Sequence, residues 1–119
     1  MPNYNERVAP ISLYPGDVGF AFNAESPAAP QSSVQFALPA FRGDASWWVT
    51  WQTSFSHVPE AVNVGLQAAD QDREGNYATI DTSTNVNGER RSLQTTARFL
   101  RIRIVSQRGP GEITVTIGA

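Results

Sequence analysis

The sequence predicts an all-β protein, an antiparallel β-sandwich of the jelly-roll type with about eight strands. Apolar residues recur at every second position in several segments, which is typical of strands that bury one face. Eight prolines and nine glycines leave few stretches long enough for a helix. Turn-forming residues separate the segments at short intervals. Together these observations favour a sandwich whose strands keep one face polar.

Alternation places the expected strands in chain order at 18–22, 34–38, 47–55, 62–68, 77–80, 92–96, 99–105 and 112–117. Pro39 indicates that the strand at 34–38 lies at an edge or contains a bulge. The segment 59–72 has helical composition, but its apolar residues are two apart, so we predict a strand there. Residues 107–111 have the sequence QRGPG, and we expect a hairpin loop joining the last two strands.

At 119 residues the chain is expected to form one domain. Residues 1–16 contain three prolines and no clean alternation, so we divide the chain into an N-terminal arm, 1–16, and a sandwich, 17–119. The arm is either a frayed terminus that packs a strand of its own domain only toward its end, or an extended segment that lies on a neighbouring subunit. It lacks the basic and apolar regions of a signal peptide, and no apolar run approaches the length of a membrane span. We therefore expect synthesis in a cytoplasm and no membrane partner.

The composition argues against several functional classes. The chain has no cysteine and one histidine, which excludes disulfides, thiol chemistry and multi-histidine metal sites. A net charge of −2 argues against general nucleic-acid binding. All nine basic residues are arginine, which the codon usage of a GC-rich genome explains without any function. We expect no cofactor.

Catalysis is not expected, because the sequence offers no convincing base. The single imidazole, His57, follows Ser56 in a loop, and adjacency in sequence is not the geometry of a nucleophile and its base. The acidic turn 70–75, with Asp81 further on, partly matches a calcium loop. Its fifth and twelfth positions depart from that pattern and strands flank it, so we interpret it as a solvated hairpin turn.

Trp48 is the aromatic residue that the predicted core does not explain. Trp47 and Trp51 share the apolar face of their strand, whereas Trp48 points to the polar face. Three interpretations stay open at this point: a loop of the same chain covers Trp48, it anchors a protein interface, or it stacks on a sugar or a base.

Arg101 and Arg103 project from the same face of their strand as Phe99. Either they form cross-strand pairs with the last strand, at Glu112 and its neighbours, or they bind a carboxylate or phosphate on a partner. The candidate partner-binding residues are Trp48, Phe99, Arg101, Arg103 and Tyr4.

Residues 62–119 resemble the second half of a galactose-binding-like, discoidin-type jelly roll. The resemblance lies in a strand followed by an acidic turn and in an aromatic–aliphatic–Arg–aliphatic strand, at 64–70, 77–80 and 97–102. It implies a carbohydrate-binding module in which Trp48, with Tyr77 or His57 near the same rim, stacks on a sugar ring. The ligand loops of that family have no counterpart in 1–46, so no sugar-binding residue is carried over.

The chain as a whole is similar to small all-β accessory proteins of tailed-phage virions. The similarity lies in the proline-bearing N-terminal arm, the Thr- and Ser-rich strands, the absence of cysteine and the arginine-only basic set. It implies a non-enzymatic decoration or cement protein of a capsid, or a related tail component, located in the virion. Its partners would be the major capsid protein or another virion protein and further copies of itself, as a dimer or trimer. The carbohydrate-binding module is the alternative.

Overall fold

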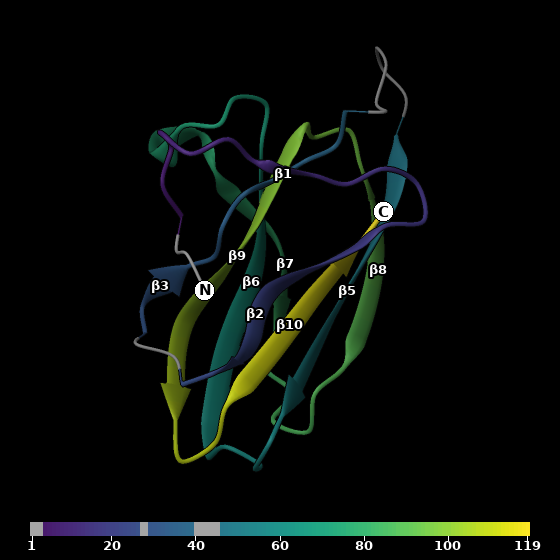
Figure 1. Cartoon of the computed structure of the whole chain (residues 1–119). Helices are drawn as coiled ribbons and strands as arrows, with labels where there is room; N and C mark the ends of the chain where they lie inside the picture. Colours follow the sequence, from purple (N-terminus) through teal and green to yellow (C-terminus); the bar gives the residue numbers. More distant parts are fainter. Residues whose placement is uncertain (1–3, 27–28, 40–45) are drawn as a thin grey trace.

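The computed structural model describes residues 4–26, 29–39 and 46–119, and it confirms the predicted all-β sandwich. Two sheets pack face to face (Figure 1). A short 3₁₀ turn, η1 (Glu74–Asn76), interrupts the strands. The strands are β1 (Ile11–Ser12), β2 (Val18–Glu25), β3 (Gln31–Ser32), β4 (Phe36–Ala37), β5 (Trp47–Phe55), β6 (Ala61–Ala69), β7 (Ala78–Ser83), β8 (Arg90–Thr95), β9 (Phe99–Arg108) and β10 (Ile113–Gly118).

The strand order is that of a jelly roll. One sheet runs β1-β4-β9-β6-β7, with β3 also paired to β9, and the other runs β2-β10-β5-β8. Apart from β1 and β3, the eight strands pair as nested partners along the chain: β2 with β10, β4 with β9, β5 with β8 and β6 with β7. Such nesting results when one long hairpin is rolled into two sheets.

The described part of the N-terminal segment packs on its own sandwich. Strand β1 pairs with β4 in parallel, so the larger sheet is mixed rather than antiparallel throughout. The amides of Tyr4 and Leu13 donate to the carbonyls of Ser32 and Ala37 at 3.0 and 2.8 Å, and Leu13 is buried in the core. Residues 4–16 therefore follow the first of the two predicted alternatives, while the domain boundary at residue 16 stays a prediction.

The predicted hairpin at 107–111 is wrong. Strand β9 lies between β4 and β6 in one sheet, and β10 lies between β2 and β5 in the other, so these residues cross from sheet to sheet. Gly109 and Gly111 have φ angles of +100° and +112°, a conformation that favours glycine. The predicted cross-strand pairing of Arg101 and Arg103 with the last strand is also wrong, because β9 and β10 lie in different sheets.

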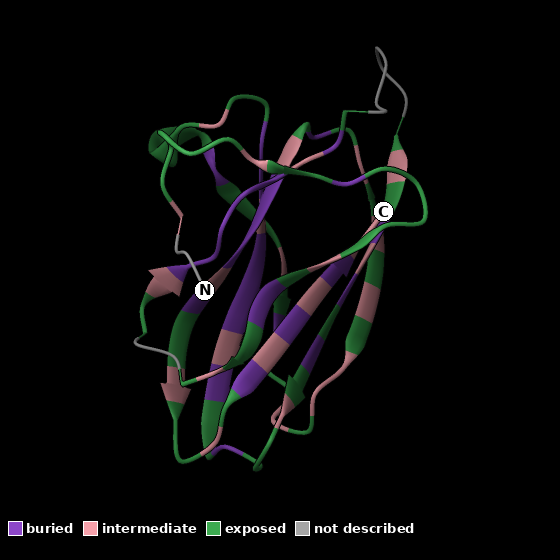
Figure 2. Cartoon of the chain, viewed as in Figure 1, coloured by how far each residue is buried: buried purple, intermediate pink, exposed green. Residues whose placement is uncertain are grey.

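The core lies between the two sheets (Figure 2). Alternate residues of the central strands are fully buried, as the period-two pattern predicts, among them Leu100, Ile102, Ile104, Ile113, Val115 and Ile117. Trp51 is also buried, and its indole Nε1 donates to Asp81 Oδ2 at 3.0 Å. Trp47 packs against this core only in part.

Gly19 of β2 tests how tightly the two sheets fit. A Cβ at this position would lie 2.6 Å from Cε1 of the buried Phe36 ring, whereas a Cβ at Gly75 would meet nothing within 4 Å. We expect Gly19→Ala to lower the free energy of unfolding by about 1–3 kcal/mol through overpacking. Gly75→Ala is the matched control and should leave stability nearly unchanged. Urea denaturation measures both, and equal effects would contradict the tight contact.

Candidate interaction surfaces

The five predicted partner-binding residues lie on the outer sides of different sheets. Trp48 is on β5 of the four-stranded sheet, whereas Phe99, Arg101 and Arg103 are on β9 of the larger sheet. Tyr4 lies in the N-terminal segment, with its ring against Arg101. The structure thus brings four of the five together and separates Trp48 from them.

Arg101 is enclosed by its own chain. Arg101 is 2% exposed, and its guanidinium carbon is 4.4 and 4.2 Å from the ring centroids of Tyr4 and Tyr77. These two rings also contact each other edge to face, with their centroids 5.4 Å apart. Nη1 and Nη2 donate to the two carboxylate oxygens of Glu74 at 2.6 and 3.1 Å, and Nε donates to Gln67 Oε1 at 2.8 Å. These contacts occupy the planar face and the donors of the guanidinium. The side chain predicted to meet acids of a partner is therefore occupied internally.

The same cluster ties the N-terminal segment to the turn after β6. Glu6 Oε2 accepts from the amide of Glu74 at 3.0 Å, and Gln35 Nε2 lies within 2.9 Å of the Asn5 carbonyl, the Val8 carbonyl and Asp72 Oδ2. In Figure 1 the N-terminal trace and η1 lie side by side at one end of the molecule. Burial raises the pKa of Tyr4 to about 12, and burial with the hydrogen bond to Asp72 raises the pKa of Tyr77.

Arg103 and Phe99 are half-buried on the same strand. Arg103 Nη1 donates to Ser32 Oγ at 2.8 Å, and Gly65 stands opposite it on β6. Phe99 pairs with Ala37 on β4 and borders a small apolar pocket of about 170 Å³. Among the described residues, the cross-strand neighbours of Arg103 are Ser32 and Gly65, and neither is the carboxylate that the sequence suggested.

The acidic turn after β6 is neither a calcium loop nor a simply solvated hairpin. Asp72 accepts from the Tyr77 hydroxyl at 2.8 Å, Glu74 binds Arg101, and Asp81 accepts from Trp51 and from Arg91 Nε at 2.9 Å. These carboxylates point to different partners. Within the described ranges no group of three or more His, Cys, Asp or Glu residues could hold a metal ion.

His57 lies in an exposed loop between β5 and β6. Its Nδ1 is 3.2 Å from Ser56 Oγ, and that hydroxyl also accepts from the amide of Glu112 at 2.8 Å. In the part of the chain that the structure describes, no carboxylate forms a hydrogen bond with the imidazole. The absence of catalysis stays a prediction.

In the described part of the chain, no segment packs over the outward side chains of the four-stranded sheet. We call these side chains the outer face. They form three rows across the strands. The first row is Val18, Thr50 and Ser92, the second is Phe20, Thr116, Gln52 and Arg90, and the third is Trp48 and Gln94. Val18, Phe20 and Trp48 are 67%, 47% and 61% exposed. Exposed aromatic and aliphatic side chains on one sheet face are typical of an interaction surface. The interpretation that a loop of the same chain covers Trp48 is therefore wrong for the described residues.

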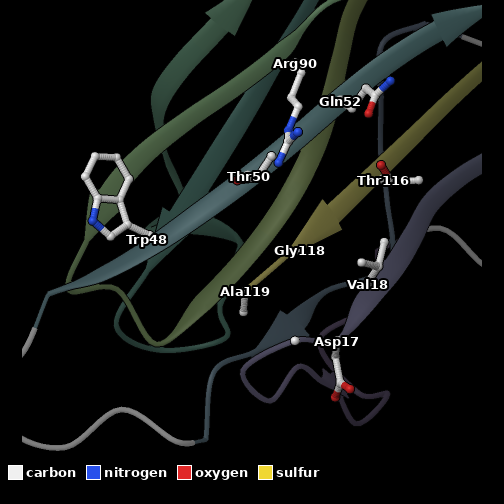
Figure 3. Close-up of a pocket in the computed structure, with 10 residues that line it drawn as sticks. Asp17, Val18, Trp48, Thr50, Gln52, Arg90, Thr116, Gly118 and Ala119 are labelled. Carbon is white, nitrogen blue, oxygen red and sulfur yellow. The ribbon is translucent and has the colours of Figure 1, made fainter.

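A shallow groove of about 420 Å³ crosses the outer face beside Trp48 (Figure 3). Thr50, Gln52 and Arg90 line it from β5 and β8, and Asp17 and Ala119 line it at the other margin. Tyr77 and His57 do not share this rim: Tyr77 is buried in the Arg101 cluster, and His57 lies in the loop after β5. The sequence singled out Trp48 on this surface, but Val18, Phe20 and Arg90 were assigned no role.

No protein-family model matches the sequence, and no curated protein matches it. Among solved structures, the SPBc2 prophage-derived protein YomS is similar with a TM-score of 0.54 and 15% identity, over 85% of this chain and 90% of that chain. The K3 cleaved adhesin domain of Lys-gingipain from Porphyromonas gingivalis gives a TM-score of 0.49 and 8% identity, over 86% and 71% of the two chains. The likeness to the prophage-derived protein shows a shared fold. In the described ranges no helix is long and apolar enough to cross a membrane.

The Arg101–Glu74 pair predicts how stability depends on pH. The hydrogen bond from Arg101 lowers the pKa of the Glu74 carboxyl from 4.5, although burial opposes this shift. A carboxyl with a lowered folded pKa stabilises the protein above its unfolded pKa, and the contribution is lost as the pH falls through the folded value. We expect the free energy of unfolding to decrease below about pH 4.5. It should decrease less steeply in Glu74→Gln. At neutral pH we expect this variant to cost about 1–3 kcal/mol, because the buried Arg101 guanidinium loses its charged partner but keeps a neutral hydrogen-bond acceptor.

Denaturant titrations from neutral pH to about pH 3 measure this dependence. Glu60→Gln is the matched control, because its exposed carboxylate is 4.0 Å from Arg108 in a surface pair. Burial raises the pKa of the Asp81 carboxyl, but the hydrogen bonds from Arg91, Trp51 and the Thr82 amide and the positive charge of Arg91 together lower it. Neither variant changes these contacts. Parallel curves for wild type and Glu74→Gln would refute the role given to this pair.

Proposed function

We propose that this protein is a non-enzymatic structural component of a phage-type virion, a capsid decoration or cement protein that stabilises the particle through protein–protein contacts. The observation that carries the proposal is the outer face, where Val18, Phe20 and Trp48 are exposed and where Arg90 is the one charged residue among those named for this face. Depletion of charge and enrichment of aromatic residues are typical of the core of an interface.

Two further observations support this proposal. The fold is shared with a prophage-derived protein, and the sequence resembles small accessory proteins of virions. The mechanism is mass action: surface that is buried only in the assembled particle shifts the equilibrium toward that particle. Trp48 supplies the largest exposed aromatic area of the outer face, and Arg103 and Phe99 remain candidate contacts on the opposite sheet.

Removal of the Trp48 side chain should weaken particle binding without unfolding the protein. In a density gradient, wild-type protein should migrate with particles induced from the source organism, whereas Trp48→Ala should stay largely in the soluble fraction. Loss of an anchor residue typically costs about 2 kcal/mol of binding energy, or roughly thirtyfold in affinity. The exposed indole makes few stabilising contacts, so the unfolding midpoint should not change.

Val58→Ala provides the matched control for this experiment. Val58 is also an exposed apolar residue, but it lies in the loop after β5 and does not line the groove beside Trp48. The control should bind as wild type does. Failure of the wild-type protein to associate with particles would refute the virion role, and equal binding by Trp48→Ala would remove the outer face from it.

A carbohydrate-binding function is the second candidate, and the groove favours it. Trp48 lines the groove together with Thr50, Gln52 and Arg90, which bring hydroxyl, amide and guanidinium groups, a combination that suits a sugar ring. Saturable quenching of tryptophan fluorescence by galactose or another hexose, absent in Trp48→Ala, would support this candidate. An unchanged spectrum over a panel of hexoses would count against it.

A further inference from the structure

We propose that the partner of the outer face is a second copy of this chain, with the two four-stranded sheets packed face to face about a two-fold axis. This inference rests on the proposed function in one respect: it keeps the outer face as the contact surface and names its occupant, so that Trp48→Ala would weaken particle binding by weakening the dimer. Sheets pack face to face in sandwiches by interdigitating flat rows of side chains. The outer face presents such rows from four strands.

Charge complementarity favours a copy of the same chain. Arg90 lies on the edge strand β8, and Asp17 immediately precedes the opposite edge strand β2, so one groove carries a cation at one margin and an anion at the other. In a two-fold contact, residue i of one copy meets residue j of the other, and the reverse contact forms as well. A single pair of charges therefore gives two ion pairs.

Both charged groups are available for this contact. The Arg90 side chain is exposed, and within the described ranges its guanidinium forms no hydrogen bond or ion pair. Asp17 is also exposed; Oδ2 of its carboxylate accepts from the amide of Tyr14 at 2.9 Å, which leaves lone pairs on both oxygens. A face with several unpaired charges of the same sign would repel a second copy of itself. The residues named for the outer face include no such cluster of like charges.

The size of the face is consistent with a reversible dimer. Four strands about 4.8 Å apart and about 25 Å long cover roughly 500 Å². Two copies would then bury on the order of 1,000 Å², near the lower limit for a specific interface. We therefore expect association in the micromolar range, with Val18, Phe20 and Trp48 buried between the sheets.

Charge reversal tests the pairing of Arg90 with Asp17. Sedimentation velocity from about 1 µM to about 1 mM should show a monomer–dimer equilibrium for the wild-type protein. Arg90→Asp and Asp17→Arg should each weaken the homodimer about tenfold or more, because two contacts become repulsive. An equimolar mixture of these two variants should restore association, since both contacts of the mixed dimer then join opposite charges.

Control variants separate this pairing from general charge effects and from misfolding. Arg98→Asp and Asp70→Arg change exposed charges elsewhere in the chain, and neither should alter the dimer. Asp17→Asn keeps an acceptor for the Tyr14 amide while removing the charge, so it should weaken association even if Asp17→Arg does not fold. In the wild type, tryptophan emission should shift to the blue as concentration rises, and Trp48→Phe should lose that shift.

The outcomes are distinguishable from those of the particle experiment. Wild-type protein that stays monomeric up to the highest concentration, or a mixture of variants that fails to associate, would overturn the dimer whether or not the protein binds particles. Conversely, a dimer that never migrates with particles would refute the virion role and leave the self-association intact.

Discussion

The arrangement of this molecule depends on the enclosure of one guanidinium. Arg101 projects from the central strand of the larger sheet, and a charge at such a position must be paired and hydrogen-bonded to remain there. Glu74 supplies the opposite charge, and the adjoining rings of Tyr4 and Tyr77 pack against the group. Because these partners come from the N-terminal segment and from the turn after β6, the enclosure covers the larger sheet around Arg101. No described segment covers Trp48 on the four-stranded sheet in a comparable way, and Trp48 is exposed there.

The sequence predicted what local periodicity determines and missed what tertiary pairing determines. Alternation identified the long strands within a few residues, since the two faces of a half-buried strand differ in composition. It could not distinguish a hairpin from a crossing between sheets at 107–111, because both need the same turn-forming glycines. The partners of Arg101 were equally inaccessible: Glu74 is 27 residues away along the chain, and no local pattern links the two. The acidic turn and the arginine strand therefore receive separate interpretations from the sequence, although Glu74 and Arg101 belong to one cluster.

The same distinction applies to the candidate interaction surface. Trp48 stood out in the sequence because an aromatic residue on a polar strand face conflicts with the alternation. Val18 and Phe20 did not, because they belong to a segment whose alternation indicates a buried face. Strand β2 departs from that pattern: its pairing with β10 shifts register after Phe20, so Phe22 points into the core while Phe20 faces solvent. A bulge of this kind changes which side chains reach each face and leaves no clear mark in the composition.

The position of the last residue has a practical consequence for handling the protein. Ala119 lines the groove beside Trp48, and its backbone is held by Gly16 and Asp17 through hydrogen bonds of 2.9 and 3.2 Å. A purification tag or fluorescent protein attached after Ala119 would begin at the margin of the outer face. It would hinder the binding of any partner to that face. For binding work, a tag is better placed at another point on the surface, such as the exposed loop that carries His57 and Val58.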